Sequence, residues 1–332
     1  MPPDNLEGRL RLRQFALAIA IHDLGSLHKA AEALNITQPA ATSALKELEA
    51  TFGTTLFERS RVGMEPTMFG RLLVERARVI LANIRATAIE MRELQGGETG
   101  EVRIGTLPSS ALGIIPQAIL LSRRHRPGVQ LHLAEGAVGQ LLPALKHGDL
   151  DLVVGRMPLA LAETDFAFEV LAAEPNVVVC RAGHPLASRS GLTLRDLAGE
   201  DWILPEEGAH FRSQWQAAFA AAGIDPPEAR IVTSSVTIRV ALLALSDMLC
   251  VLTRRAAFSM RDRGEIAILD VPIYREVPPS IVVWRAGAMR TPAARAFCDY
   301  LREAADATEQ PVAGPGALPP GGNAARQDID NQ

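Results

Sequence analysis

The sequence predicts an α/β protein in which a small, mostly helical N-terminal domain precedes a larger domain of alternating strands and helices. Three observations lead to this prediction. The chain has 332 residues, more than one ordinary hydrophobic core accommodates, so it divides into two or three domains. Apolar residues recur at helical spacing as far as residue 94. Beyond the glycine-rich segment 95–100, short apolar runs alternate with helical stretches.

Composition and charge limit the class of protein. A hydrophobic content of 48% beside a charged content of 22% predicts a soluble globular chain. The formal charge of −4 argues against a protein that coats nucleic acid without specificity, since such binding needs a broad basic surface. The longest apolar run, VALLALSDMLCVL from Val240, contains Ser246 and Asp247 and is too short to span a bilayer. We therefore expect no membrane partner.

The cellular compartment is predicted from the N-terminus and the cysteines. MPPDNLEGRLRLRQ lacks the basic start, apolar stretch and small-residue cleavage site of an export signal. Cys180, Cys250 and Cys298 are widely spaced and odd in number, which favours a reducing compartment over a disulfide framework. We expect a cytoplasmic protein.

Three helices are predicted in the first 53 residues. The first covers residues 10–22 and ends before Gly25. Ser26 can cap the second helix, and after a break at Asn35 and Ile36, Thr37 can cap the third. Pro39 in the first turn of the third helix costs nothing, because its missing amide would be unpaired there. The inward apolar positions of the second and third helices are Ala30, Ala31, Leu34, Ala41, Leu45, Leu48 and Phe52.

A hairpin and a long helix follow. The stretch TTLFERSRVGMEPT, with Gly63 and Pro66 as turn residues, predicts a small wing that completes a domain over residues 1–66. Residues 67–94 carry apolar residues every three or four positions and predict a helix about 40 Å long. Its near-heptad stripe indicates pairing with a second chain, although packing on its own domain is the alternative. Residues 95–100 form a predicted hinge.

The remaining chain predicts two sets of βαβ units and therefore parallel sheets. The first set includes EVRIGTL, VQLHLAEG and DLVVGR, and the second includes NVVVCRA, DWILPE and ARIVTSS. The last set, EIAILDVP, PSIVVWRA and the helix 291–305, can return to the first subdomain. We expect one lobe at about 101–170 and 269–307 and a second at about 171–268. Residues 308–332 have too little apolar content to pack and are expected to be disordered.

Four blocks of the N-terminal region share the spacing of a known family. They are the residues from Leu12 to Phe15, GSLHKAAEALNITQPAATSALKELE, FGTTLFERS and EPTMFGRLL. This region resembles the DNA-binding domain of the LysR-type transcriptional regulators, a winged helix-turn-helix. The larger part resembles that family's effector domain, a two-lobed periplasmic-binding-protein type 2 fold, through VRIG, RPGV, GDLDLVVGR, HPLA and DWIL. The resemblance spans Leu10 to Ala305 and narrows to regulators of sugar-binding-protein and protocatechuate genes.

The resemblance implies a DNA-binding regulator that forms homodimers or homotetramers and responds to a small-molecule effector. In the third helix, Gln38 and Thr42 lie opposite the apolar stripe, where a major groove can be read. The predicted DNA-binding residues are Ser26, Lys29, Thr37, Gln38, Pro39, Thr42, Ser43, Lys46, Arg59 and Arg61. For an isolated segment, the alternative is that the polar face of the third helix is only exposed to solvent and does not bind DNA. Many relatives carry Ser and Arg at the positions of Thr42 and Ser43, so one contact to DNA is expected to be missing.

The charge distribution agrees with this division. Residues 1–92 contain 12 Lys and Arg against 10 Asp and Glu, and the rest contain 22 against 28. The N-terminal part therefore has a small positive surplus, whereas the larger part is acidic.

A site for an acid is predicted where strands meet helix starts. Ser109 and Ser110 follow one strand, Thr233, Ser234 and Ser235 follow another, and Arg156 can pair with a carboxylate. The predicted effector-binding residues are Thr106, Ser109, Ser110, Arg156, Pro205, Thr233, Ser234 and Ser235. In the alternative, the hydroxyls only cap helices and Arg156 bridges elements within its lobe. Ala137 and Val138, where relatives often have Thr or Ser, indicate a less polar wall. The expected effector is a small organic acid or a sugar-derived metabolite.

Three other classes of protein are disfavoured by the sequence. An enzyme is disfavoured because the sequence lacks the G-x-S-x-G, H-E-x-x-H, Walker and G-x-G-x-x-G motifs. Cys180 and His184 are four apart, but they lack further partners for a nucleophile or a metal site. A redox-responsive regulator of the same fold remains an alternative, although no two cysteines are close in sequence. A solute-binding protein would need an export signal. We expect no catalytic residues, metal or cofactor.

Overall fold

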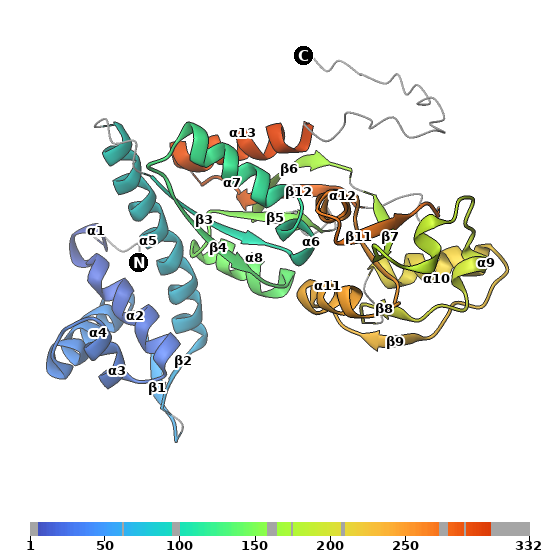
Figure 1. The fold of residues 1–332 in the computed structure, drawn as a ribbon. Helices are drawn as coiled ribbons and strands as arrows, with labels where there is room; N and C mark the ends of the chain where they lie inside the picture. The colour runs from blue at the N-terminus through green and yellow to red at the C-terminus, as the bar shows by residue number, and fades with distance from the viewer. Residues whose placement is uncertain are drawn as a thin grey trace, which may run out of the picture.

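The computed structural model describes residues 6–61, 63–94, 100–157, 165–173, 175–206, 210–271, 278–288 and 290–306. The predicted tail, 308–332, and all of the predicted hinge except Gly100 lie outside these residues. A helical N-terminal domain, a long helix and two lobes follow one another along the chain (Figure 1). Among the described residues, no helix is both long and apolar enough to cross a membrane.

The N-terminal domain contains α1 (Leu6–Arg9), α2 (Leu12–Leu24), α3 (Leu27–Ala33), α4 (Gln38–Phe52) and the hairpin of β1 (Phe57–Arg59) and β2 (Met64–Pro66). The predicted caps are confirmed. The Ser26 hydroxyl accepts the Lys29 amide and the Thr37 hydroxyl accepts the Ala40 amide, each at 3.4 Å. The break between α3 and α4 is made by Asn35, which adopts the left-handed conformation at φ 53°. The helices enclose a core of small and branched apolar residues: Leu17, Ala18, Ile21, Ala30, Ala41 and Leu48.

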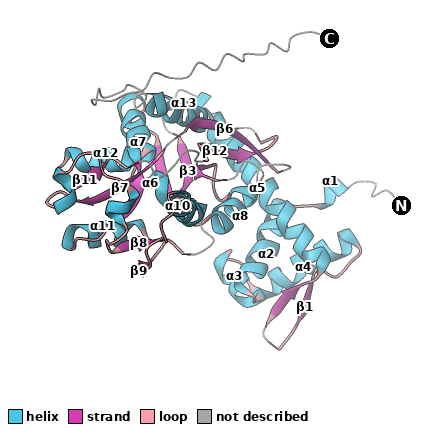
Figure 2. Cartoon of the chain, turned by 90° about the vertical axis from the view of Figure 1, so that its right-hand side faces the viewer, coloured by secondary structure: helices cyan, strands magenta, loops and turns pink. Residues whose placement is uncertain are grey.

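Helix α5 (Met68–Leu94) is the predicted long helix. It starts where the Thr67 hydroxyl accepts the Gly70 amide at 3.1 Å. Val74 and Ala77 are buried in the core of the N-terminal domain, so one face of the helix is used within the chain. Other apolar side chains on the helix are exposed: Met68, Phe69, Leu72, Ile80, Ile84 and Met91. Figure 2 shows α5 between α2 and the lobes.

Lobe 1 is built on a five-stranded sheet in the order β4-β3-β5-β12-β6. Its elements are β3 (Glu101–Thr106), α6 (Pro108–Ala111), α7 (Ile114–His125), β4 (Gln130–Glu135), α8 (Val138–His147), β5 (Leu152–Arg156), β6 (Phe166–Ala172), β12 (Ser280–Arg285) and α13 (Pro292–Asp306). Alternate residues of β5 serve two cores. Leu152 and Val154 pack with α7 and α13, whereas Val153 packs with α8.

The expectation of parallel sheets was only partly right. Strands β4, β3 and β5 are parallel, but β12 runs antiparallel to both β5 and β6. The reason is that the chain enters β12 from lobe 2, without the crossover helix that a parallel neighbour requires. Strand β6 was not predicted, because half-buried FAFEVLA lacks the continuous apolar character of a central strand.

Lobe 2 contains two smaller sheets. Its elements are β7 (Asn176–Arg181), η2 (Pro185–Ser188), α9 (Leu194–Leu197), β8 (Trp202–Leu204), α10 (His210–Ala221), β9 (Ala229–Val232), α11 (Val236–Leu245), β10 (Cys250–Thr253), α12 (Arg254–Asp262) and β11 (Ile266–Leu269). Strand β7 lies antiparallel between β10 and β11, and β8 pairs with β9 in parallel. Trp202, Trp215 and Phe219 form the aromatic centre of the lobe, with the two indole centroids 5.4 Å apart.

Candidate functional site

Helix α4 presents a polar face away from its core. Ala41, Leu45 and Leu48 are buried, whereas Gln38, Pro39, Ser43 and Lys46 are exposed. This division places the predicted base-reading residues on one accessible side of a helix.

Two hydroxyls on α4 already have partners. Thr42 is half-buried, and its hydroxyl donates to the Gln38 carbonyl at 2.9 Å. The Ser43 hydroxyl donates to Glu47 Oε1 at 3.4 Å, a long bond. Thr42 therefore offers DNA its methyl group and an acceptor oxygen, while Ser43 can exchange a weak bond for a contact with DNA.

The wing is fixed against the turn between α2 and α3. The Met64 amide donates to the Gly25 carbonyl at 2.8 Å. Gly63 lies so close that a Cβ there would be 2.4 Å from the same oxygen. Arg59 and Arg61 are exposed on the hairpin, and Lys29 is exposed on α3. The hairpin projects from the end of the domain where α3 lies (Figure 1). The wing arginines and Lys29 are accessible to phosphates on this surface.

A cavity of about 250 Å³ lies between the two lobes. Ser109 and Arg156 from lobe 1 and Pro205 from lobe 2 line it, so three of the predicted effector residues meet in one place. Much of the remaining wall is apolar and comes from both lobes: Pro108, Leu112, Met157, Val236, Val251 and Leu252. The shape and lining are those of a small-molecule site with few polar groups.

The other predicted effector residues do not line this cavity. Thr106 is buried and its hydroxyl donates to the Leu107 carbonyl at 3.2 Å, and Ser110 is only 1% exposed. The Ser235 hydroxyl caps α11 by accepting the Ile238 amide at 3.3 Å. Thr233 accepts the Ser235 amide at 3.1 Å, and Ser234 is exposed. The alternative assignment, in which such hydroxyls order the backbone, fits Thr233 and Ser235.

Arg156 connects the lobes. Its Nη1 donates to Asn176 Oδ1 at 2.9 Å, and Asn176 is the first residue of the lobe 2 strand β7. Both residues line the cavity. This contact crosses between the lobes.

Arg239 is a second cation of the cavity that sequence reasoning missed. It lies on α11, where its Nη1 donates to the Val251 carbonyl at 2.9 Å. Its Nε is fully buried and has no hydrogen-bond partner in the described part of the chain. Burial lowers the pKa of the guanidinium from its ordinary value. The sequence does contain a signal for Arg239. It is the single charged residue in the apolar helix VTIRVALLAL, and burying a charge there costs free energy unless the charge has a function.

The thiols do not form a reactive or sensing pair. Cys250 lies opposite Val179, and the Cys180 and Cys250 side chains pack in separate cores on opposite faces of the lobe 2 sheet. Burial raises the pKa of the Cys180 and Cys298 thiols to about 11 and that of Cys250 to about 12. The redox alternative therefore has no observation in its favour.

His184 has a structural role. Its Nε2 lies 3.0 Å from the Asp247 carbonyl and its Nδ1 accepts the Leu186 amide at 3.1 Å, so both ring nitrogens of this buried side chain are occupied. No group of three or more His, Cys, Asp or Glu side chains suited to a metal ion occurs among the described residues. The pairing of Cys180 with His184 as a nucleophile or half a metal site is unsupported.

Comparison with known proteins agrees with both regions. A family described as "Bacterial regulatory helix-turn-helix protein, lysR family" matches residues 12–71, and one described as "LysR substrate binding domain" matches residues 95–306. The transcriptional regulator GbpR of Azospirillum brasilense is 34% identical over 91% of this chain and 88% of its own length. The regulator GalR of Pseudomonas putida is 29% identical over 89% of this chain and 73% of its own length.

Solved structures share the fold. Full-length OxyR from Pseudomonas aeruginosa has a TM-score of 0.63 at 24% identity and covers 88% of this chain and 95% of its own. CbnR, a LysR family transcriptional regulator, has a TM-score of 0.62 at 22% identity and covers 89% and 99%. The family matches cover both regions, and the regulator relatives span most of the chain. The chain therefore belongs to the LysR family of bacterial transcriptional regulators: it is a DNA-binding regulator with an effector-binding domain, and not an enzyme.

Proposed function

We propose that this regulator responds to a small organic acid with an apolar body, bound in the cavity between the lobes. Arg239 carries the proposal, since it lines the cavity and its buried Nε has no hydrogen-bond partner among the described residues, so an anion in the cavity would stabilise it. Arg156 supplies a second cation from the opposite lobe, and Ser109 supplies a hydroxyl. A sugar-derived metabolite fits less well, because its many hydroxyls would face apolar walls.

At the other end of the chain, we propose that α4 reads the major groove and that the wing contacts the backbone. Gln38 is the residue suited to an adenine edge, and Ser43 and Lys46 extend the same exposed face. Arg59 and Arg61 would meet phosphates or the adjacent minor groove. Pairing of two copies through the exposed apolar side chains of α5 would present two α4 helices to two half-sites. A regulator of this kind works in the cytoplasm, where its operator lies.

Gel-shift assays with the DNA upstream of its own gene and of the neighbouring gene test the DNA-binding proposal. We expect specific binding that weakens as salt increases, since the phosphate contacts release counterions. Equal affinity for the upstream DNA and for a scrambled fragment would contradict sequence-specific reading.

The effector proposal is tested by thermal shift with carboxylic acids of six to ten carbons and their uncharged amides. Acids should raise the unfolding temperature and the amides should not. Arg156→Ala and Arg239→Met should each weaken acid binding roughly 10- to 100-fold, the usual loss for a charge-assisted hydrogen bond. The control is Arg263→Ala, which removes an exposed arginine of the same lobe as Arg239. Stabilisation by amides as strong as by acids would refute an anionic effector.

A further inference from the structure

We propose that residues 146–151, the last two residues of α8 and the turn that leads to β5, form a reversible docking contact that transmits changes in the cavity to the DNA-binding domain through α5; this segment is called the turn below. The proposal rests on the proposed function only in taking the cavity as the effector site. Three sets of contacts carry it: those between the turn and α5, those between α5 and α2, and those between the turn and the cavity.

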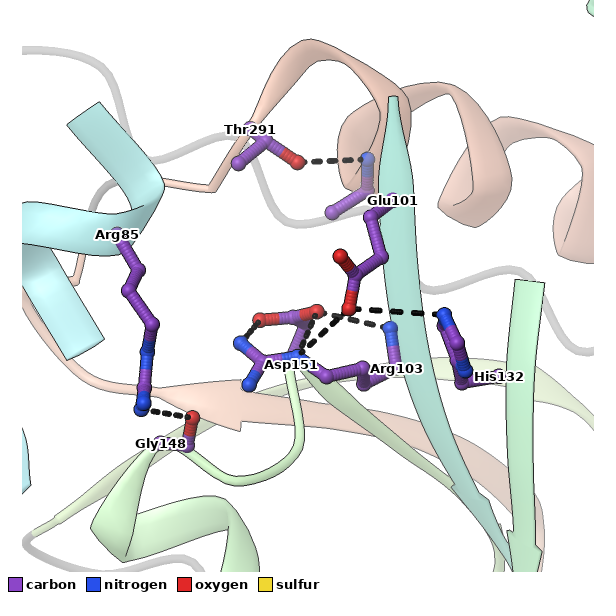
Figure 3. A network of polar contacts seen from close by, with 8 residues as sticks. Arg85, Glu101, Arg103, His132, Gly148, Asp151 and Thr291 are labelled. Carbon is purple, nitrogen blue, oxygen red and sulfur yellow. Dashed lines mark hydrogen bonds and ion pairs between the residues drawn. The ribbon is translucent and has the colours of Figure 1, made fainter. Parts of the chain in front are cut away.

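The turn lies directly on the long helix. Lys146 Nζ is 2.8 Å from Glu75 Oε1 on α5 and 2.8 Å from Asp165 Oδ2 of lobe 1. Gly148 has a φ of +76°, and a Cβ at this position would lie 2.2 Å from the Cβ of Ala82. Arg85 reaches from α5 to the Gly148 carbonyl, with Nη2 at 3.5 Å (Figure 3). Glycine is therefore required at this position both for its backbone conformation and for the close approach of α5.

The same stretch of α5 holds the DNA-binding domain. Arg78 forms a short ion pair with Asp23 of α2, and Val74 and Ala77 are buried in the N-terminal core. Positions 74–85 span about three helical turns. Lobe 1 and the N-terminal domain thus both contact residues 74–85 of α5. If the turn shifts, either α5 moves with it relative to the N-terminal domain, or the contact between the turn and α5 breaks.

A rigid strand joins the turn to the cavity. Strand β5 begins at Leu152, directly after the turn, and ends at Arg156, which lines the cavity. Five residues of extended chain span about 17 Å. Asp151 fixes the start of this strand, since its carboxylate accepts the Arg103 backbone amide at 2.8 Å and the Arg103 Nη2 at 3.0 Å (Figure 3). Because β5 is short and held at its start, a displacement of Arg156 is expected to move the turn as well.

The contact is weak enough to be reversible. Lys146, Glu75 and Asp165 are between 34% and 49% exposed, and ion pairs at such sites contribute little free energy. A cavity of about 380 Å³ remains at the junction, lined by residues of α2, of α5 and of the turn, including Arg85, His147 and Asp149. Lys146 keeps its partner Asp165 within lobe 1 when α5 leaves. Small polar contacts of this kind between domains permit two arrangements whose populations a ligand can shift.

Amide hydrogen exchange of the full-length protein tests the docking. Gly148→Ala should accelerate exchange in residues 75–85 roughly three- to tenfold, because the new Cβ displaces Ala82. The matched control is Gly264→Ala, since Gly264 has a φ of +75° and nothing within 4 Å of an added Cβ. Both substitutions carry the same backbone strain, so a difference between them reports the contact with α5. Adding Gly148→Ala to Ala82→Gly should cause no further acceleration beyond that of Ala82→Gly alone, because the clashing methyl group is gone. Equal exchange in the two alanine variants would overturn the proposal.

Arg156→Ala tests the transmission without any ligand. It removes the bond to Asn176 across the cavity, so it should alter exchange in residues 75–85 of the otherwise unchanged protein and have no further effect in Gly148→Ala. If Arg156→Ala changed exchange in residues 75–85 equally in the otherwise unchanged protein and in Gly148→Ala, the contact between the turn and α5 would not carry the change, and the proposal would be wrong. Failure of the acid-binding assay would leave this result intact, because no acid is present. Should Gly148→Ala misfold by circular dichroism, Lys146→Glu takes its place, with Glu75→Lys as the rescue.

Discussion

Replacing Gly70 with alanine tests how the long helix is joined to the wing. A Cβ at Gly70 would lie 2.0 Å from the Leu56 carbonyl oxygen and 3.3 Å from the Pro66 Cβ. That carbonyl accepts the Thr67 amide at 2.9 Å and the Thr67 hydroxyl at 3.2 Å. The methyl group can be accommodated only if the backbone before β1 moves away from the start of α5, which weakens both contacts.

The expected loss follows from three contributions. Overpacking against backbone costs about 1–3 kcal/mol. The weakened bond from the Thr67 amide costs about 1 kcal/mol; the Thr67 hydroxyl adds little, because its single proton has a nearer acceptor in the Thr55 carbonyl at 2.8 Å. The gain in helix propensity from glycine to alanine offsets up to ~1 kcal/mol. We therefore expect Gly70→Ala to lower the free energy of unfolding of the N-terminal domain by about 1–3 kcal/mol. Operator binding should weaken as well, because the start of the wing at Leu56 shifts relative to α5.

Denaturant unfolding followed by circular dichroism measures the change as a lower midpoint concentration. Gly139→Ala is the control, since Gly139 lies in α8 with nothing within 4 Å of an added Cβ. That substitution should be neutral or stabilise lobe 1 by up to ~1 kcal/mol. If Gly70→Ala unfolds at the same denaturant concentration as the unchanged protein, the close approach to Leu56 does not constrain the domain and the reasoning fails.

Three further predictions concern DNA, pH and thiols. Arg59→Ala should reduce the slope of log affinity against log salt by roughly 1.8 for a dimer, about 0.9 for each wing; an unchanged slope in gel shifts would exclude a phosphate contact. The hydrogen bond from Lys146 holds the pKa of Glu75 below its ordinary value of 4.5. That stabilisation is complete above pH 4.5 and is lost as the pH falls through the lowered pKa, so Lys146→Ala should remove this part of the acid dependence of thermal unfolding. The three thiols should react with a disulfide reagent at pH 7 only after denaturation, because burial keeps them protonated; rapid reaction of the folded protein would revive the redox alternative.

Features that depend on nearby residues were predictable from the sequence. Ser26 and Thr37 cap helices because a hydroxyl three residues before a free amide suffices, whatever lies elsewhere in the fold. The wing was predictable from its turn residues, and α5 was predictable from apolar residues that recur every three or four positions. The exposed polar face of α4 could therefore be predicted from the sequence, and its role in DNA binding stays a prediction.

Features that depend on distant residues were not. The antiparallel direction of β12 is set by where the chain re-enters lobe 1, and no pattern within SIVVWR distinguishes it from a parallel strand. At the cavity, Ser109 and Ser110 are adjacent in sequence, yet only Ser109 lines the wall while Ser110 is buried. Arg239 was missed because its neighbours in the cavity, Arg156 and Ser109, lie more than 80 residues away. Similarly, the sequence indicates only that Gly148 ends a helix, and its close approach to Ala82 is seen only in the structure.

The acidic larger part of the chain is compatible with DNA binding because of where it lies. Residues beyond 92 carry six more acidic than basic side chains, which repel phosphates. Helices α2 and α5 stand between α4 and the lobes in both views (Figures 1 and 2). Each helix is about 10 Å across, and the screening length at physiological ionic strength is about 8 Å. A charge on the far side of both helices is therefore screened from α4, because crossing two helices exceeds the screening length. We therefore expect the surplus of two basic residues over 1–92, which includes Arg59 and Arg61 on the wing, to govern the encounter with DNA.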